Sequence, residues 1–179
     1  MPYPWSAGDT LNAADLNTGA SWYVKTQTIT GTPTSVTITN AFSSDFAHYR
    51  IVGYNLDTTT TGDDIEMELG NGGSHTSSYF GNTVAKKYNA ASAYSQFTNT
   101  GPMPIGFTNA AAGAVHIDVT IYAPQVAGYT TWSQMAGSLR GYDVNGFYNG
   151  TDSFTSVTFE CTAGTWVGGQ FRVYGIVDG

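Results

Sequence analysis

Hydrophobic and polar side chains alternate residue by residue in short stretches of this chain. The alternation is clear in HYRIVGYNL (residues 48–56) and VHIDVTIY (residues 115–122), and residues such as Gly, Asn and Thr separate one stretch from the next. A period of two residues is typical of a β-strand with one buried face. The pattern predicts about nine strands, at residues 34–39, 48–56, 64–69, 79–88, 103–107, 115–122, 131–139, 154–161 and 170–177.

No convincing helical period follows residue 20. Many short strands joined by turn residues favour an all-β fold, in the form of an antiparallel β-sandwich or barrel. We predict a jelly-roll-like β-sandwich of eight strands over residues 28–179, preceded by a distinct segment at residues 1–27. At 179 residues the chain has the length of one domain and can bury a sizeable core without a metal or a disulfide.

The opening segment has a different pattern from the rest of the chain. It predicts a turn at residues 6–9, Asn12 as a helix cap, about one helical turn at residues 13–17, and Gly19 as the stop. So short a helix is not stable alone in water. We therefore expect Trp5, Leu11 and Leu16 to be buried, either against this chain's own body or against another protein. The segment lacks the basic start and apolar run of a secretory signal, so we expect it to be retained.

Composition narrows the possible functions. Only 11% of the residues are charged, and the formal net charge is −7. An acidic chain whose only adjacent basic pair is Lys86 and Lys87 is not expected to bind nucleic acid. No apolar run approaches the ~20 residues of a membrane span, so no membrane association is predicted. The single cysteine, Cys161, excludes an intrachain disulfide and is interpreted as a small strand residue rather than a nucleophile.

The densest acidic patch lies in the predicted strand DIEMEL, at residues 64–69. Asp64, Glu66 and Glu68 are expected on one face, and residues 65, 67 and 69 on the other. Carboxylates at this spacing could bind Ca²⁺, but the stretch lacks the motif of a calcium loop. We therefore favour a solvated face and predict no metal and no cofactor. A glycosidase pair of Glu66 with Asp118 or with Glu160 is a weaker alternative.

Histidines and aromatic residues offer two further candidates. His48, His75 and His116 have no metal-binding spacing and no nucleophile motif accompanies them, so we predict no catalytic residues. Two polar stretches are rich in aromatic residues, which either bind a glycan or a protein or close the ends of the sandwich. The candidate partner surface consists of His75, Tyr79, Phe80, Tyr94, Phe97, Tyr142, Phe147 and Tyr148.

Three stretches resemble virion proteins of tailed bacteriophages. WSAGDTLNAADLN is similar to a short N-terminal motif of such proteins, and SVTITNAFSSDFAHYRIVGYNL and GTWVGGQFRVYGI resemble the early strands and the last strand of phage fibre, tail and head-decoration jelly rolls. Residues 57–150 carry no such resemblance. The positions that match the N-terminal motif are Trp5, Gly8, Asp9, Leu11, Ala13, Asp15, Leu16 and Asn17.

The resemblance implies a non-enzymatic structural protein on the capsid or tail surface of a virion, assembled in the host cytoplasm. It implies a homotrimer whose N-terminal segment docks on capsid or tail proteins while the jelly roll faces outward. Because the chain has neither coiled-coil heptads nor a triple-β repeat, a capsid decoration (cement) protein is favoured. The alternative is a small tail or head fibre that adheres to host glycans. A stand-alone lectin and a β-sandwich glycan hydrolase are further alternatives.

Overall fold

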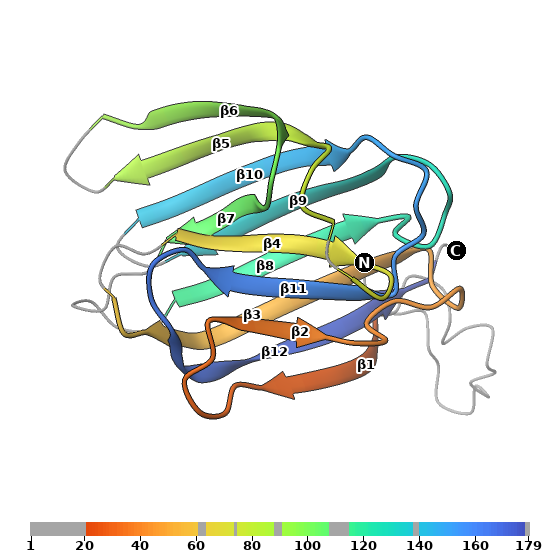
Figure 1. The fold of residues 1–179 in the computed structure, drawn as a ribbon, viewed down its shortest axis with the longest axis horizontal. Coiled ribbons are helices and arrows are strands. Elements are labelled where there is room, and N and C mark those ends of the chain that lie inside the picture. Colours follow the sequence, from red (N-terminus) through yellow and green to blue (C-terminus); the bar gives the residue numbers. More distant parts are fainter. Residues whose placement is uncertain are drawn as a thin grey trace, which may run out of the picture.

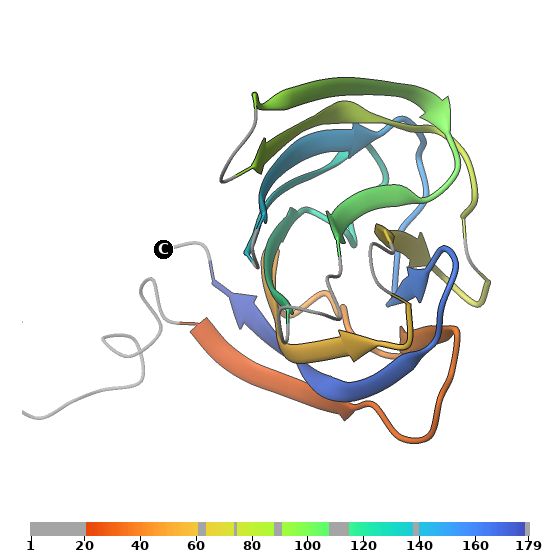
Figure 2. The same ribbon diagram turned by 90° about the vertical axis from the view of Figure 1, so that its left-hand side faces the viewer.

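The computed structural model describes residues 21–60, 64–73, 75–87, 91–107, 115–137 and 140–177. These residues form strands and no helix, in two antiparallel sheets (Figures 1 and 2). The larger sheet has eight strands, in the order β1 (Ser21–Thr28), β12 (Trp166–Ile176), β3 (His48–Thr58), β8 (Val115–Tyr122), β9 (Thr130–Gly137), β10 (Arg140–Tyr148), β5 (Tyr79–Lys87) and β6 (Ala93–Thr100). The smaller sheet has four, in the order β2 (Ser35–Ile38), β11 (Ser156–Cys161), β4 (Asp64–Gly70) and β7 (Met103–Phe107).

Eight of these strands have the connectivity of a jelly roll. The half-sheet β1-β12-β3-β8 faces β2-β11-β4-β7, and the chain passes between the sheets at β1 to β2, β3 to β4, β7 to β8 and β11 to β12. The predicted fold class is therefore confirmed. Two inserted hairpins, β5–β6 and β9–β10, pair with each other and extend the large sheet beyond β8. Figure 2 shows this large sheet curling around the small one.

Three strands were not among those predicted, namely β1, β6 and β10. β1 is an edge strand with no fully buried side chain, so its sequence does not alternate clearly. Residues 21–27 were grouped with the opening segment, but they pair with β12 as part of the sandwich. The predicted helical turn at residues 13–17 lies outside the described residues.

Aromatic rings from both sheets meet in the core. Phe159 of β11 stacks on Phe171 of β12 with ring centroids 4.2 Å apart and an interplanar angle of 9°. Trp166 packs edge-on against Phe171 at 5.9 Å, and all three side chains are fully buried. Such stacking adds to the free energy gained by removing the rings from water. Cys161, at the end of β11, is buried as a small strand residue, in agreement with its predicted place.

The strand β4 confirms the predicted division of its two faces, with one exception. Ile65, Met67 and Leu69 are fully buried in the core. On the other face Asp64 is exposed, but Glu68 is only 5% exposed, so the prediction of a solvated carboxylate face is wrong at this residue. Glu68 lies opposite Thr158 of β11 in the sheet, where both side chains are covered.

Glu160 of β11 is also influenced by burial and by a carboxylate of β4. It lies directly opposite Glu66 in the register of β11 and β4, and Glu68 is two residues further along β4. Burial, and next the charge of Glu68, raise the pKa of Glu160 above its ordinary value of 4.5. A carboxyl whose pKa is raised by folding stabilises the protein when protonated, and this stabilisation is lost as the pH rises through the folded-state pKa.

We predict that Met67→Asp destabilises the fold by about 3–5 kcal/mol, because it places an unpaired charge in the core. Glu66→Ala, on the opposite face of the same strand, is expected to change stability by about 0.5 kcal/mol or less. Thermal or denaturant unfolding of the two variants beside the wild type measures both effects. Equal melting of the two variants would contradict the assignment of the faces.

We also predict that Glu160→Gln raises the melting temperature at pH 7 by about 1–2 °C, since it removes a partly buried charge near Glu68. The gain should shrink as the pH is lowered toward 4.5 and below, where the wild-type carboxyl becomes protonated as well. Melting curves from pH 4 to 8 test this expectation. A gain that is the same at every pH would show that charge is not its cause.

Candidate ligand-binding surface

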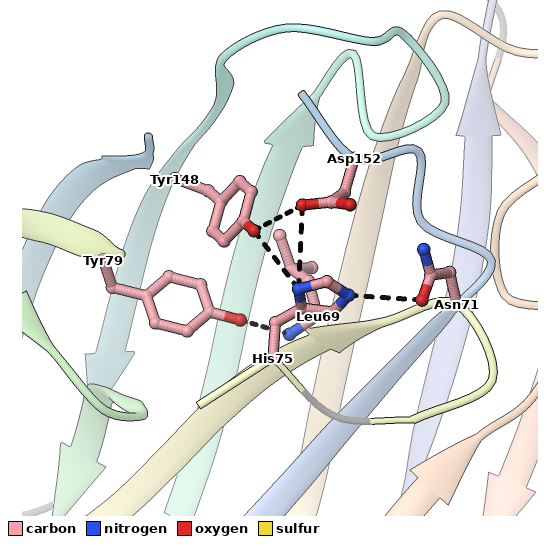
Figure 3. Close-up of polar contacts among 6 residues, drawn as sticks. All are labelled: Leu69, Asn71, His75, Tyr79, Tyr148 and Asp152. Atoms are coloured by element: carbon pink, nitrogen blue, oxygen red, sulfur yellow. Dashed lines mark hydrogen bonds and ion pairs between the residues drawn. The ribbon is translucent and has the colours of Figure 1, made fainter. Parts of the chain in front are cut away.

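A network of polar side chains encloses one end of the sandwich (Figure 3). His75, in the loop after β4, places Nδ1 3.2 Å from the hydroxyl of Tyr148 and Nε2 3.2 Å from Oδ1 of Asn71. The Tyr148 hydroxyl donates to Oδ2 of Asp152 at 2.6 Å. The backbone N–H of Leu69 donates to the hydroxyl of Tyr79 at 2.9 Å. The network ties the β4–β5 loop to β10 and to the segment before β11.

This network holds a loop in place and presents no activated nucleophile. Burial, and next the hydrogen bond to Asp152, raise the pKa of Tyr148 to about 12, so its hydroxyl stays protonated at neutral pH. Burial also raises the pKa of Tyr79, which is fully buried. The rings of His75 and Tyr148 pack edge-on against Phe154, with centroids 5.1 and 4.9 Å from it. These residues therefore close the end of the sandwich, one of the two roles expected for the aromatic residues.

A second group of aromatic side chains lies on the outer face of the large sheet. Register places Tyr122, Thr131, Phe147 and Phe80 in one row across β8, β9, β10 and β5. The neighbouring row is polar and consists of Thr120, Ser133, Asn145, Asn82 and Gln96. Because successive residues of a strand alternate between its faces, both rows point away from the core. The aromatic side chains thus stand beside a strip of amides and hydroxyls.

Three rings form a wall along this strip. Phe147 stacks on Phe80 with centroids 5.3 Å apart and an interplanar angle of 10°. Tyr129, at the start of the β9–β10 hairpin, packs edge-on against Phe147 at 5.8 Å. Tyr129 is 67% exposed and Phe147 is 38% exposed. Large exposed rings fixed by their neighbours are typical of binding surfaces.

A depression of about 590 Å³ lies beside this wall, a volume within the usual range for ligand sites. Its floor includes Gly81 and Gly146, which face each other across β5 and β10. A Cβ on Gly146 would come within 2.6 Å of the Trp132 ring, and one on Gly81 within 2.6 Å of the Phe97 ring, so both rings press against glycine backbone. We call this site the aromatic depression; its lining is Gly81, Asn82, Tyr129, Thr131, Trp132, Asn145, Gly146 and Phe147.

The polar groups of the aromatic depression are uncharged. Asn82 and Asn145 provide amides and Thr131 provides a hydroxyl, and no acidic or basic side chain is part of its lining. The hydroxyl of Tyr94 on β6 donates to Oδ1 of Asn82 at 2.7 Å. This bond orients the Asn82 amide, whose NH₂ group and second Oδ1 lone pair can still take part in hydrogen bonds.

A second, polar depression of about 470 Å³ adjoins the first and shares Asn145 with it. Here Arg50 of β3 donates from Nε and Nη2 to the two carboxylate oxygens of Asp118 on β8, at 2.8 and 2.5 Å. This bidentate pair, and above all its hydrogen bonds, raises the pKa of Arg50 and neutralises its charge. The lining of this second depression also includes the acidic residue Asp143, so the strip beyond Asn145 is polar and carries charged groups.

The residues of the predicted partner surface divide between the two places. Phe80, Tyr94 and Phe147 are on the outer face, whereas Tyr79, Phe97 and Tyr148 are buried on the inner side and Tyr142 packs partly against the core. His75 belongs to the network at the end of the sandwich. Sequence reasoning missed Asn82, Tyr129, Thr131 and Asn145, because only the strand register brings them together. The anchor residues Trp5, Gly8, Asp9, Leu11, Asp15, Leu16 and Asn17 lie outside the described residues.

The other predicted sites are also separated by the fold. Glu66 is in the small sheet while Asp118 is paired with Arg50 in the large one, so only Glu66 and Glu160 are neighbours. His48 and His116 are on β3 and β8, away from the loop of His75. Within the described ranges, no group of three or more His, Cys, Asp or Glu side chains is arranged to hold a metal ion. No described helix is long and apolar enough to cross a membrane.

Comparison of the chain with protein families, with curated proteins and with solved structures finds no match. The likeness to phage virion proteins rests on the three sequence stretches alone.

Proposed function

We propose that this chain is a non-enzymatic structural protein on the surface of a tailed-bacteriophage virion. Its most suitable role is that of a capsid decoration protein, attached to the particle by its N-terminal segment. The jelly roll would be displayed outward as a homotrimer. The partners in this role are capsid or tail proteins of the same particle, and no cofactor is needed.

The observation that carries this proposal is the placement of the phage-like stretches in one part of the fold. SVTITNAFSSDFAHYRIVGYNL supplies β2 and most of β3, and GTWVGGQFRVYGI supplies β12. β12 pairs with β3 on one side and with β1 on the other. The two stretches are far apart in the sequence but pair as neighbouring strands. This supports the interpretation that both resemble the same phage domain.

The position of β1 supports attachment through the segment before it. β1 is the edge strand of the large sheet, and it begins at Ser21 directly after the phage-like motif. The other edge of this sheet is β6, next to the aromatic depression (Figure 1). A protein held at the β1 edge would leave the inserted hairpins accessible. Of the two carboxylate pairs of the hydrolase alternative, Glu66 and Asp118 lie in different sheets, and Asp118 is paired with Arg50. Only the pair Glu66 and Glu160, which are neighbours in the small sheet, remains for that alternative.

We predict that deleting residues 1–20 leaves the sandwich folded and abolishes attachment to particles that lack this protein. Among the residues that the structure describes, the buried core runs from Ile29 to Val173 and is expected to hold together without the opening segment. Burial of Trp5, Leu11 and Leu16 in a neighbouring protein would contribute about 1.5–3 kcal/mol each. Thermal melting measures the first effect, and co-sedimentation with the particles measures the second.

Two point variants sharpen this test. Trp5→Ala should weaken attachment, because buried aromatic residues dominate interfaces. Trp22→Ala, which removes a partly exposed tryptophan on β1, should not. Unfolding of the truncated protein, or its undiminished attachment, would overturn the proposal that the segment is a separable anchor. Copy number separates the two particle roles: hundreds of copies indicate decoration, and a few dozen or fewer indicate a fibre.

A further inference from the structure

We propose that the aromatic depression is a binding site for a neutral saccharide. This assignment goes beyond the structural role above, since a decoration protein needs no ligand. It assigns a class of ligand to the aromatic side chains that are exposed on the inserted hairpins. The site is formed by Tyr129 and Phe147, by the amides of Asn82 and Asn145, and by the hydroxyl of Thr131.

The exposed rings of Tyr129 and Phe147 favour a ligand that presents C–H groups to them. The face of an aromatic ring carries partial negative charge, so it attracts the C–H groups that line one side of a pyranose. Tyr129 and Phe147 pack edge-on at 87°, and Phe80 supports Phe147 from behind by stacking. Their mutual contacts hold the rings in place before a ligand arrives, which lowers the entropic cost of binding.

The polar groups select hydroxyls. An amide side chain offers two donors and an acceptor, and adjacent sugar hydroxyls can bind it through both kinds of group. Asn82 and Asn145 lie directly opposite each other on β5 and β10. The bond from Tyr94 fixes the Asn82 amide, so its orientation is set by the protein.

The lining contains no charged side chain, which argues against two other classes of ligand, nucleic acids and acidic polysaccharides. A nucleic acid or an acidic polysaccharide would need cations, but the lining contains none and the adjacent Arg50 is paired with Asp118. The formal net charge of −7 also repels polyanions. A neutral sugar needs only rings, amides and hydroxyls, which are the groups that the depression provides.

The test uses the full-length protein and a panel of neutral and acidic bacterial surface polysaccharides immobilised for biolayer interferometry. Neutral members should bind and acidic ones should not. Tyr129→Ala should weaken binding about tenfold, and Asn145→Ala should also weaken it. Tyr23→Ala is the matched control, because Tyr23 is similarly exposed (62%) and packs edge-on against Tyr174 at the far edge of the same sheet. This control should bind like the wild type.

Three outcomes overturn the assignment: no neutral polysaccharide binds, only acidic ones bind, or Tyr129→Ala and Tyr23→Ala behave alike. Co-sedimentation of Tyr129→Ala with particles is measured in parallel and should be unchanged. If this variant loses particle attachment or its oligomeric state and the wild type binds no sugar, the face is a protein interface and the saccharide assignment fails. Because sugar binding is measured without particles, its failure is distinguishable from failure of the N-terminal anchor.

Discussion

The pairing of β10 with β5 determines the shape of this molecule, because it joins two hairpins inserted at different points of a jelly roll into one sheet. Gly146 and Gly81 face each other in this pairing, two residues before the end of β10. A Cβ on either residue would lie 2.3–2.4 Å from a carbonyl oxygen of the opposite strand. A side chain at these positions would therefore push the strands apart. The close pairing of β10 with β5 therefore depends on glycine at both positions.

The same two glycines affect both the inner and the outer face of the large sheet. On the inner side, the Trp132 and Phe97 rings approach the glycine backbone closely and belong to the buried core. On the outer side, the absence of protruding side chains leaves a hollow next to Tyr129 and Phe147. The core and the proposed site therefore depend on one backbone contact. A change made to fill the hollow would also disturb the packing beneath it.

Sequence alternation predicted what depends on nearest neighbours in the chain. It identified the buried face of β4 at Ile65, Met67 and Leu69, and it gave the all-β jelly-roll class. It did not predict the burial of Glu68, which depends on contacts from outside its strand. It also missed β10, where Gly141 and Gly146 interrupt the alternation. Sequence alternation could not predict the aromatic depression, because the residues of β5 and β10 become neighbours only when these two strands pair.

The two edges of the large sheet now have different physical characters. At the β1 edge, the strand has no fully buried side chain and is preceded by apolar residues in a motif that resembles a phage anchor. Beyond β8, the inserted hairpins carry uncharged amides, hydroxyls and exposed rings. Residues 57–150, which bear no phage resemblance, contain both hairpins. In the roles proposed above, attachment and recognition would be able to vary independently, since the N-terminal segment that would hold the particle is separate in sequence from the strands that would contact a ligand.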